Sequence, residues 1–70
     1  MELDLGAYIV STLSQVEVEH AVLFFGGRNE RIKSAHLDSQ FPGVLFAIDD
    51  RHQMLAVQVS AIDGVRFVTD

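Results

Sequence analysis

The stretch LAVQVSAIDGVRFVT, residues 55–69, constrains the fold most, because it places two apolar runs on either side of a short polar corner. Successive side chains of a β-strand point to opposite faces, so Leu55 and Val57 share one face of a first strand. Val65 and Phe67 repeat that period after the corner Ser-Ala-Ile-Asp-Gly. The stretch predicts two strands joined by a tight corner, and the rest of the chain supplies their partners.

A short helix and three further strands are expected upstream. Asp4 is suited to cap a helix over about residues 4–15, in which apolar residues recur at spacings of three and four. Glycine and proline at Gly26-Gly27 and Pro42-Gly43, and a polar loop at residues 49–52, separate the strands. The strands are expected at about residues 16–25, 29–37, 44–49, 53–60 and 65–69.

One helix followed by five strands, with no crossover helix, predicts a mainly β fold. We expect a single domain over residues 1–70, a strongly bent antiparallel SH3-like barrel. The alternative is a simple meander, because Asp63-Gly64 is a strong hairpin signal that would pair residues 65–69 with residues 55–59.

The composition predicts self-association. The chain has 70 residues, of which 49% are hydrophobic, and its mean hydropathy is +0.24. A domain of this size buries only about 60% of the surface that its unfolded chain exposes. Cysteine is absent from the sequence, so disulfides cannot supplement the small core. Association between copies is the expected supplement.

Charge and hydropathy also limit the partners. The formal net charge of −5 opposes a general attraction to phosphate backbones, so nucleic-acid binding needs a local basic patch. The one basic cluster contains Arg28, Arg31, Lys33 and His36. The longest apolar run, residues 21–25, is far too short to cross a bilayer, and a basic leader does not open the chain. A soluble, cytoplasmic protein without a membrane partner is expected.

The order of elements resembles the Sm-like family, and its bacterial Hfq branch in particular. The resemblance covers almost the whole chain, in the family's order and at nearly its spacing. After the N-terminal helix come a Val-Glu-Val strand start and a strand end Phe-Phe-Gly-Gly-Arg. The turn Leu-Asp-Ser-Gln-Phe at residues 37–41 and the corner Ala-Ile-Asp-Gly-Val at residues 61–65 complete the set.

The resemblance implies that the fifth strand leaves the fourth strand and pairs with residues 18–23 of the same chain. It implies a homo-oligomeric ring of about five to seven copies, in which the fourth strand of one subunit pairs with the fifth strand of the next. It also implies single-stranded RNA as a ligand near the pore, with Phe41 as a stacking surface. A basic strand repeated around the ring would become multivalent. The residues expected to bind RNA are Asp38, Gln40, Phe41, Gln58, Ser60, Arg28, Arg31 and Lys33.

Other positions depart from the family pattern and point to a second use of such a ring. Val59 stands where the family carries a cation that would meet a phosphate, and valine can neither carry charge nor donate a side-chain hydrogen bond. Ser14 and Gln15 stand in a shorter connection in place of an arginine-rich rim. The alternative is a ring-forming structural or protein-interaction module that does not bind RNA.

Catalytic and metal patterns are weak. Ser34, His36 and Asp38 alternate along one predicted strand, but neighbours two apart lie about 6.5 Å from each other, beyond the roughly 3 Å that a nucleophile and its base need. The histidines, which also include His20 and His52, are too widely separated for a local metal-ligand spacing. We therefore expect neither an enzyme nor a bound cofactor or metal.

Overall fold

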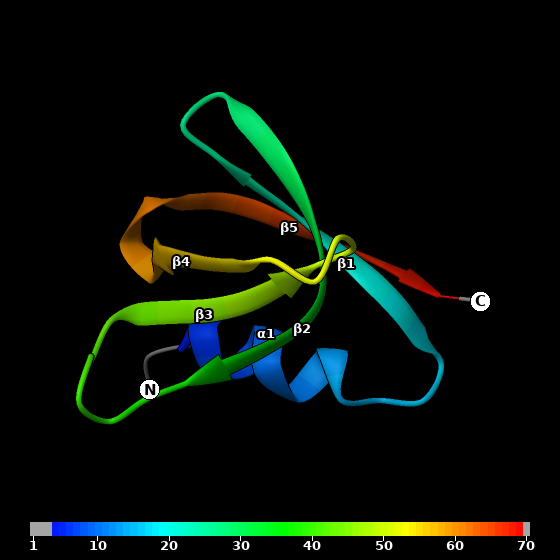
Figure 1. Ribbon diagram of the computed structural model, residues 1–70, viewed down its shortest axis with the longest axis horizontal. Helices are drawn as coiled ribbons and strands as arrows, with labels where there is room; N and C mark the ends of the chain where they lie inside the picture. The colour runs from blue at the N-terminus through cyan, green and yellow to red at the C-terminus, as the bar shows by residue number, and fades with distance from the viewer. Residues whose placement is uncertain (1–3, 70) are drawn as a thin grey trace.

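A short helix precedes five strands in this computed structural model, which describes residues 4–69 (Figure 1). Residues 1–3 and 70 of the expected domain lie outside the described residues. Neighbouring strands are antiparallel and form one sheet in the order β4-β3-β2-β1-β5, which confirms the mainly β class. The elements are α1 (Leu5–Leu13), β1 (Val18–Phe25), β2 (Arg28–Leu37), β3 (Val44–Asp49), β4 (Met54–Gln58), the 3₁₀ turn η1 (Val59–Ala61) and β5 (Ile62–Thr69).

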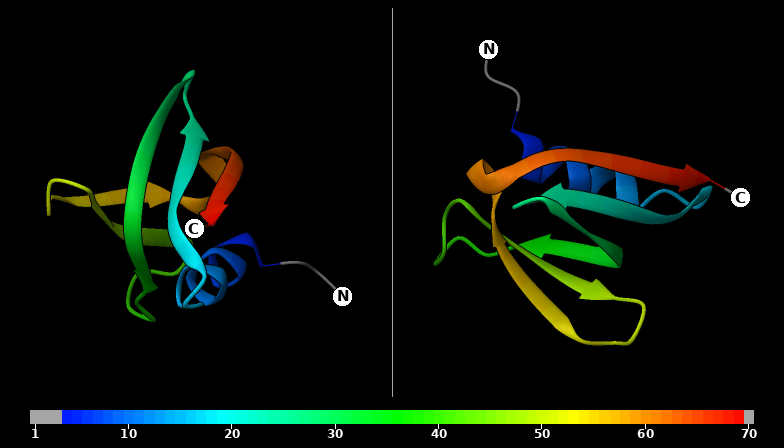
Figure 2. Two further views of the ribbon diagram at one scale, coloured as in Figure 1. Left: turned by 90° about the vertical axis from the view of Figure 1, so that its right-hand side faces the viewer. Right: turned by 90° about the horizontal axis from the view of Figure 1, so that it is seen from above.

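The last strand pairs with the first. Leu23 lies opposite Val65, and Val18 lies opposite Thr69, so the meander alternative is wrong. The physical reason is η1, which turns the chain away from β4 before β5 begins. The dipeptide Asp63-Gly64 lies inside β5 at a register shift, not in a hairpin turn. The right-hand view of Figure 2 shows β4 and β5 diverging from this corner.

The sheet remains open between its two ends. β4 and β5 are the edge strands, so the closed barrel expected from the sequence is not confirmed within one chain. The bend that brings the two ends around comes from β2. This strand pairs with β1 over residues 28–32 and with β3 over residues 32–37. Ile32 lies opposite both Ala21 and Asp49, and a register shift follows it at Lys33. Such a bulge bends its strand and increases the local twist.

The core is small for so apolar a chain. Eight hydrophobic residues are buried within the described part, against a hydrophobic content of 49% for the sequence. Larger side chains remain exposed, among them Met54 on β4, with 66% of its surface accessible. Tyr8 of α1 packs edge-on against Phe67 of β5 but is half-exposed. The buried hydrophobic residues are Ile9, Ala21, Leu23, Ile32, Leu45, Ala47, Val57 and Ile62.

Several element boundaries differ from those expected. β1 begins at Val18, two residues late, because residues 15–18 form a turn in which Val16 is fully exposed. α1 ends at Leu13, where the N–H of Ser14 still bonds the carbonyl of Val10. β4 ends at Gln58 and β5 begins at Ile62, because η1 occupies the corner. β2 begins one residue earlier than expected.

The start of α1 is capped by its own side chain and lies close to the sheet. The Asp4 side chain caps the helix, since its Oδ1 accepts the N–H of Ala7 at 3.2 Å. Gly6 allows a close approach, because a Cβ added there would lie 3.1 Å from Val59 Cγ2 and 3.2 Å from Leu37 Cδ2. The first turn of α1 is thereby held beside the corner that follows β4.

Truncation of the β2 pivot should destabilise the protein strongly. We expect Ile32→Ala to lower the free energy of unfolding by about 2–5 kcal/mol, because the side chain is fully buried and leaves a cavity between two strand pairs. Urea unfolding at one fixed protein concentration measures the change. The control Val16→Ala, at a fully exposed position, should change stability by less than about 0.5 kcal/mol. A loss below about 1 kcal/mol for Ile32→Ala would contradict the pivot role.

The helix cap can be tested without changing the core. Asp4→Ala should cost about 1 kcal/mol of stability, because the N–H of Ala7 loses its acceptor. Asp4→Asn should cost only a few tenths, because an asparagine oxygen caps as well. Thermal and urea unfolding of both variants give the comparison. Equal losses in the two variants would show that the charge of Asp4, not its cap, stabilises the helix.

Candidate functional site

A groove of about 480 Å³ lies where α1 begins, where β2 turns into β3 and where η1 follows β4. Three segments that are distant in the sequence therefore form one recess. Its walls are mainly apolar, and two carboxylates are part of the lining. The lining residues are Asp4, Leu37, Asp38, Ser39, Phe41, Pro42, Gly43 and Val59.

The loop between β2 and β3 contains two consecutive turns. Asp38 begins the first turn: its Oδ1 accepts the N–H of Gln40 at 2.9 Å, and its carbonyl accepts the N–H of Phe41 at 3.0 Å. In the second turn Pro42 is followed by Gly43 with φ of +81°, and the N–H of Val44 bonds the carbonyl of Phe41 at 3.3 Å. Proline followed by a positive-φ glycine is the sequence that a type II turn requires. The loop is thus held by its own backbone and side chains.

The loop is also tied to the corner after β4. The N–H of Val59 donates to the carbonyl of Gly43 at 2.8 Å. This bond places the Val59 side chain beside the loop, where it lines the groove with Leu37 and Phe41. The corner therefore contributes an apolar surface to the site.

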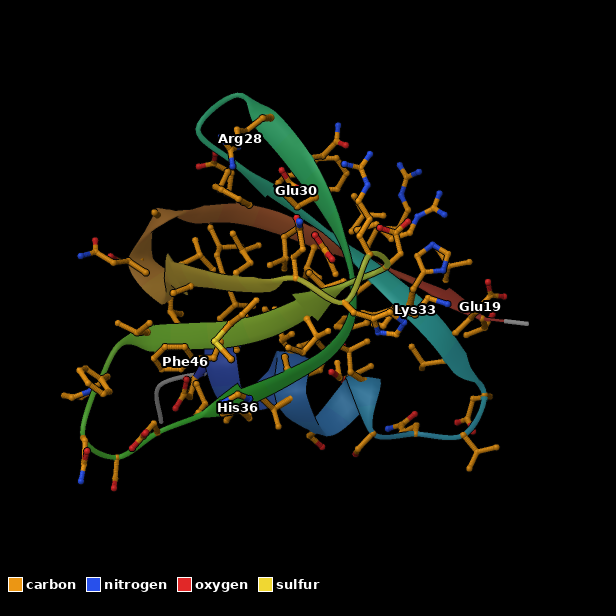
Figure 3. The ribbon with its side chains drawn as sticks, in the orientation of Figure 1. Glu19, Arg28, Glu30, Lys33, His36 and Phe46 are labelled. Atoms are coloured by element: carbon orange, nitrogen blue, oxygen red, sulfur yellow. The ribbon has the colours of Figure 1, made fainter. Side chains whose placement is uncertain are left out.

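An aromatic row extends from the loop along the outside of the sheet. Phe41 packs edge-on against Phe46, with ring centroids 5.9 Å apart, and still exposes 53% of its surface. His36 stacks on the same Phe46 ring at 5.4 Å and an interplanar angle of 17° (Figure 3). Phe41 is therefore both a packing contact and an accessible ring.

The expected RNA-binding residues do not form one site. Asp38 and Phe41 line the groove, whereas Gln40, Gln58 and Ser60 are exposed and are not part of its lining. Gln58 and Ser60 flank Val59 in the sequence, so they lie next to the groove. None of the expected basic residues is among the groove residues that the structure describes.

The basic cluster expected along residues 28–36 is divided. Arg28 lies at the β1–β2 hairpin, where its guanidinium is 3.5 Å from the Glu30 carboxylate and 5.2 Å from the centroid of the Phe25 ring (Figure 3). Arg31 approaches Asp50 at 4.0 Å. His36 belongs to the aromatic row. All four basic residues lie on β2, as expected, but Glu30 lies beside Arg28, Asp50 lies near Arg31, and an aromatic ring stacks on His36.

A different basic pair appears across three strands. Val22 of β1 lies opposite Arg31 of β2 and also opposite Arg66 of β5. Residues directly opposite each other in antiparallel strands project from the same face, so the two arginines share a face with Val22 between them. Arg66 was not among the expected site residues, because only the β1–β5 register brings it near Arg31.

Asp4 belongs to the groove, although the sequence did not indicate it as a site residue. It was expected only as a helix cap, and it also lines the groove with Asp38. Among the residues that line the groove in the described structure there is no lysine, arginine or histidine. The groove is therefore apolar and acidic.

Residues 4–69 also bear on metal and membrane sites. Groups of three or more histidine, cysteine, aspartate or glutamate side chains that could hold a metal ion are not found there. The helix in this range is too short to span a bilayer. Two of the three alternating residues Ser34, His36 and Asp38 have other contacts, since His36 stacks on Phe46 and Asp38 accepts the N–H of Gln40.

The chain was also compared with known proteins. Neither the protein-family models, nor the curated proteins, nor the solved structures contain a match to it.

Proposed function

We propose that copies of this chain assemble into a Sm-like ring that serves as a protein-interaction module. The observation that carries the proposal is the pairing of β5 with β1, because it leaves β4 and β5 as two open edges of one bent sheet. In the ring, β4 of one copy pairs with β5 of the next copy. Each open sheet is then completed by its neighbours, and the edge that would otherwise invite uncontrolled pairing is covered.

The backbone of β4 supports this assembly. Gln53 accepts the N–H of Asp49, and Val59 donates to Gly43, so the odd-numbered residues of this segment face β3. Hydrogen-bonding direction alternates along a strand, and the even-numbered residues therefore direct their backbone groups outward. These residues are Met54, Ala56 and Gln58. They offer a neighbouring strand a short ladder of donors and acceptors.

Side chains at the two edges support it as well. Leu55 on β4 and Val65 and Phe67 on β5 pack against the core but are only half-buried in one chain. A neighbouring copy at either edge would complete their burial. Burial of apolar surface contributes about 25 cal/mol per Å², which is the main source of stability for such an interface. The ring size of about five to seven copies and the cytoplasmic location stay predictions from the sequence.

The groove favours a protein over RNA as the ligand of the ring. Base recognition near a phosphate backbone needs donors or cations, and the groove contributes Val59 together with two carboxylates. Arg28, one of the expected cations, lies beside Glu30 at the start of β2, whereas the groove lies at the end of that strand. The net charge of −5 acts in the same direction.

A proline at the β4 edge should prevent assembly. Ala56→Pro removes the central outward N–H of β4 while it leaves the hydrogen bonds to β3 intact, so proline is tolerated within one chain. We expect light scattering after size exclusion to give a multiple of 7.8 kDa for the wild type and a clearly smaller mass for this variant.

The matched control places proline away from both edges. Ser39→Pro puts a proline at the second position of the Asp38–Phe41 turn, where the fixed φ of proline is favoured. This variant should keep the mass of the wild type. A monomeric wild-type protein would overturn the ring, and an unchanged mass for Ala56→Pro would show that copies associate through another surface.

Single-stranded RNA is the second candidate ligand, and two observations favour it. The ring of Phe41 is half-exposed at the end of an aromatic row, as a base-stacking surface requires. Arg31 and Arg66 share a face, and a ring of copies repeats that pair. The RNA candidate is weakened by one fact: the two arginines and Phe41 belong to different parts of the surface.

Titration with labelled oligo-U and oligo-A separates the two candidates. We expect only weak binding, in the non-specific range of roughly 10⁻⁴ to 10⁻⁶ M, that weakens steeply between about 50 and 200 mM salt. Fluorescence anisotropy measures it. Submicromolar affinity that survives moderate salt and is lost in Phe41→Ala would make RNA the ligand. Phe41→Leu is the control, because it keeps an apolar side chain without the aromatic ring.

A further inference from the structure

The groove combines an apolar wall, an accessible aromatic ring and two carboxylates, and together these favour one kind of ligand. It has an apolar wall from Leu37, Pro42 and Val59, and it has an accessible aromatic ring in Phe41. Its volume of about 480 Å³ lies within the range of pockets that hold small ligands or a few peptide side chains. All lining residues belong to one chain, so the groove exists before any ring forms.

The two carboxylates of the groove are oriented but not neutralised. Oδ1 of Asp4 accepts the N–H of Ala7, and Oδ1 of Asp38 accepts the N–H of Gln40. Each carboxylate is therefore fixed by its own backbone turn. Within residues 4–69 neither aspartate forms an ion pair. The second oxygen of each carboxylate is left to accept hydrogen bonds from a ligand.

Phe41, like the two carboxylates, attracts a positively charged ligand. The face of an aromatic ring attracts a cation, and arginine in particular stacks on such faces. A guanidinium in the groove would meet carboxylate oxygens and an aromatic ring, while its aliphatic stem would lie along the apolar wall. The two carboxylates would repel a phosphate there, and no lysine, arginine or histidine lines the described groove to offset that repulsion.

We infer that the groove binds an arginine side chain presented by an extended segment of a partner protein, with Asp4 and Asp38 as its counter-ions and Phe41 as its stacking surface. The inference rests on the proposed use of the protein as an interaction module. It does not depend on ring closure, because one chain supplies the whole groove.

The test uses three capped tripeptides that differ only at the central residue: acetyl-Leu-Arg-Leu-amide, acetyl-Leu-Gln-Leu-amide and acetyl-Leu-Glu-Leu-amide. Titration of the full chain, followed by amide chemical shifts, locates and quantifies binding. We expect the arginine peptide to shift the amides of residues 37–41, Gly43 and Val59, with at least fivefold higher affinity than the glutamine peptide. The glutamate peptide should cause no shifts there.

Charge-only variants connect binding to the two aspartates. Asp4→Asn and Asp38→Asn keep a side-chain oxygen for the helix cap and for the turn, so the groove keeps its shape. Each should weaken the arginine peptide about two- to fivefold, and the double variant about tenfold. Glu17→Gln is the matched control, because it removes the same charge from an exposed position between α1 and β1, outside the groove and outside both edge strands. Its affinity should equal that of the wild type.

Several outcomes would overturn the inference. If the glutamine peptide binds as tightly as the arginine peptide, the groove recognises only apolar groups. If the glutamate peptide or oligo-U shifts the amides of the groove, the groove is an anion site. An unchanged affinity in the double variant would exclude the two counter-ions. Light scattering of the same samples keeps the proposed ring separate: an assembled protein that fails to bind the peptide loses only this inference, whereas a monomer that binds it loses only the ring.

Discussion

The double pairing of Ile32 is the constraint on which the rest of the structure depends. This residue is buried and lies opposite one strand on each side, Ala21 in β1 and Asp49 in β3. The register shift at Lys33 then turns the second half of β2 away from β1. Without that bend the two halves of the sheet would continue in one direction, and the edges β4 and β5 would lie further apart.

The groove is a consequence of the same bend. It needs the start of α1, the loop after β2 and the corner after β4 to meet, although about 30 residues or more separate α1 from the other two segments in the sequence. Two local contacts hold them together: the backbone bond from Val59 to Gly43, and the close approach at Gly6 that any larger residue would disturb. A site on such a junction is placed by the fold and not by one motif.

Local patterns were enough to predict the element order and the turns. Alternation located the strands, and Pro42-Gly43 indicated the turn that Gly43 forms with φ of +81°. The pairing of β5 with β1 was one of two alternatives, since Asp63-Gly64 favoured a hairpin equally well by local rules. Only the corner η1, which depends on packing as well as on its own residues, decides between them.

The candidate site was harder to predict, for an equally physical reason. Phe41 and Asp38 could be chosen from the loop sequence, but Asp4 joins them through tertiary contacts alone. Spacing along the chain was enough to place the basic residues on one strand, but not to show their neighbours: Arg28 lies beside Glu30, while Arg31 shares a face with Arg66. Long-range register, which one sequence does not contain, determines which charges act together.

Assembly into a ring would change how tightly a multivalent partner binds, but not the kind of side chain that each groove accepts. Each copy contributes one apolar and acidic recess, so a closed ring presents the same recess at regular intervals. A partner with several arginine-bearing segments would then bind with avidity well above the affinity of one groove, provided that its linkers span neighbouring copies. Repulsion between the recesses is limited, because physiological salt screens exposed charges beyond about 8 Å. Weak contacts in one chain are therefore compatible with firm recruitment by the assembly.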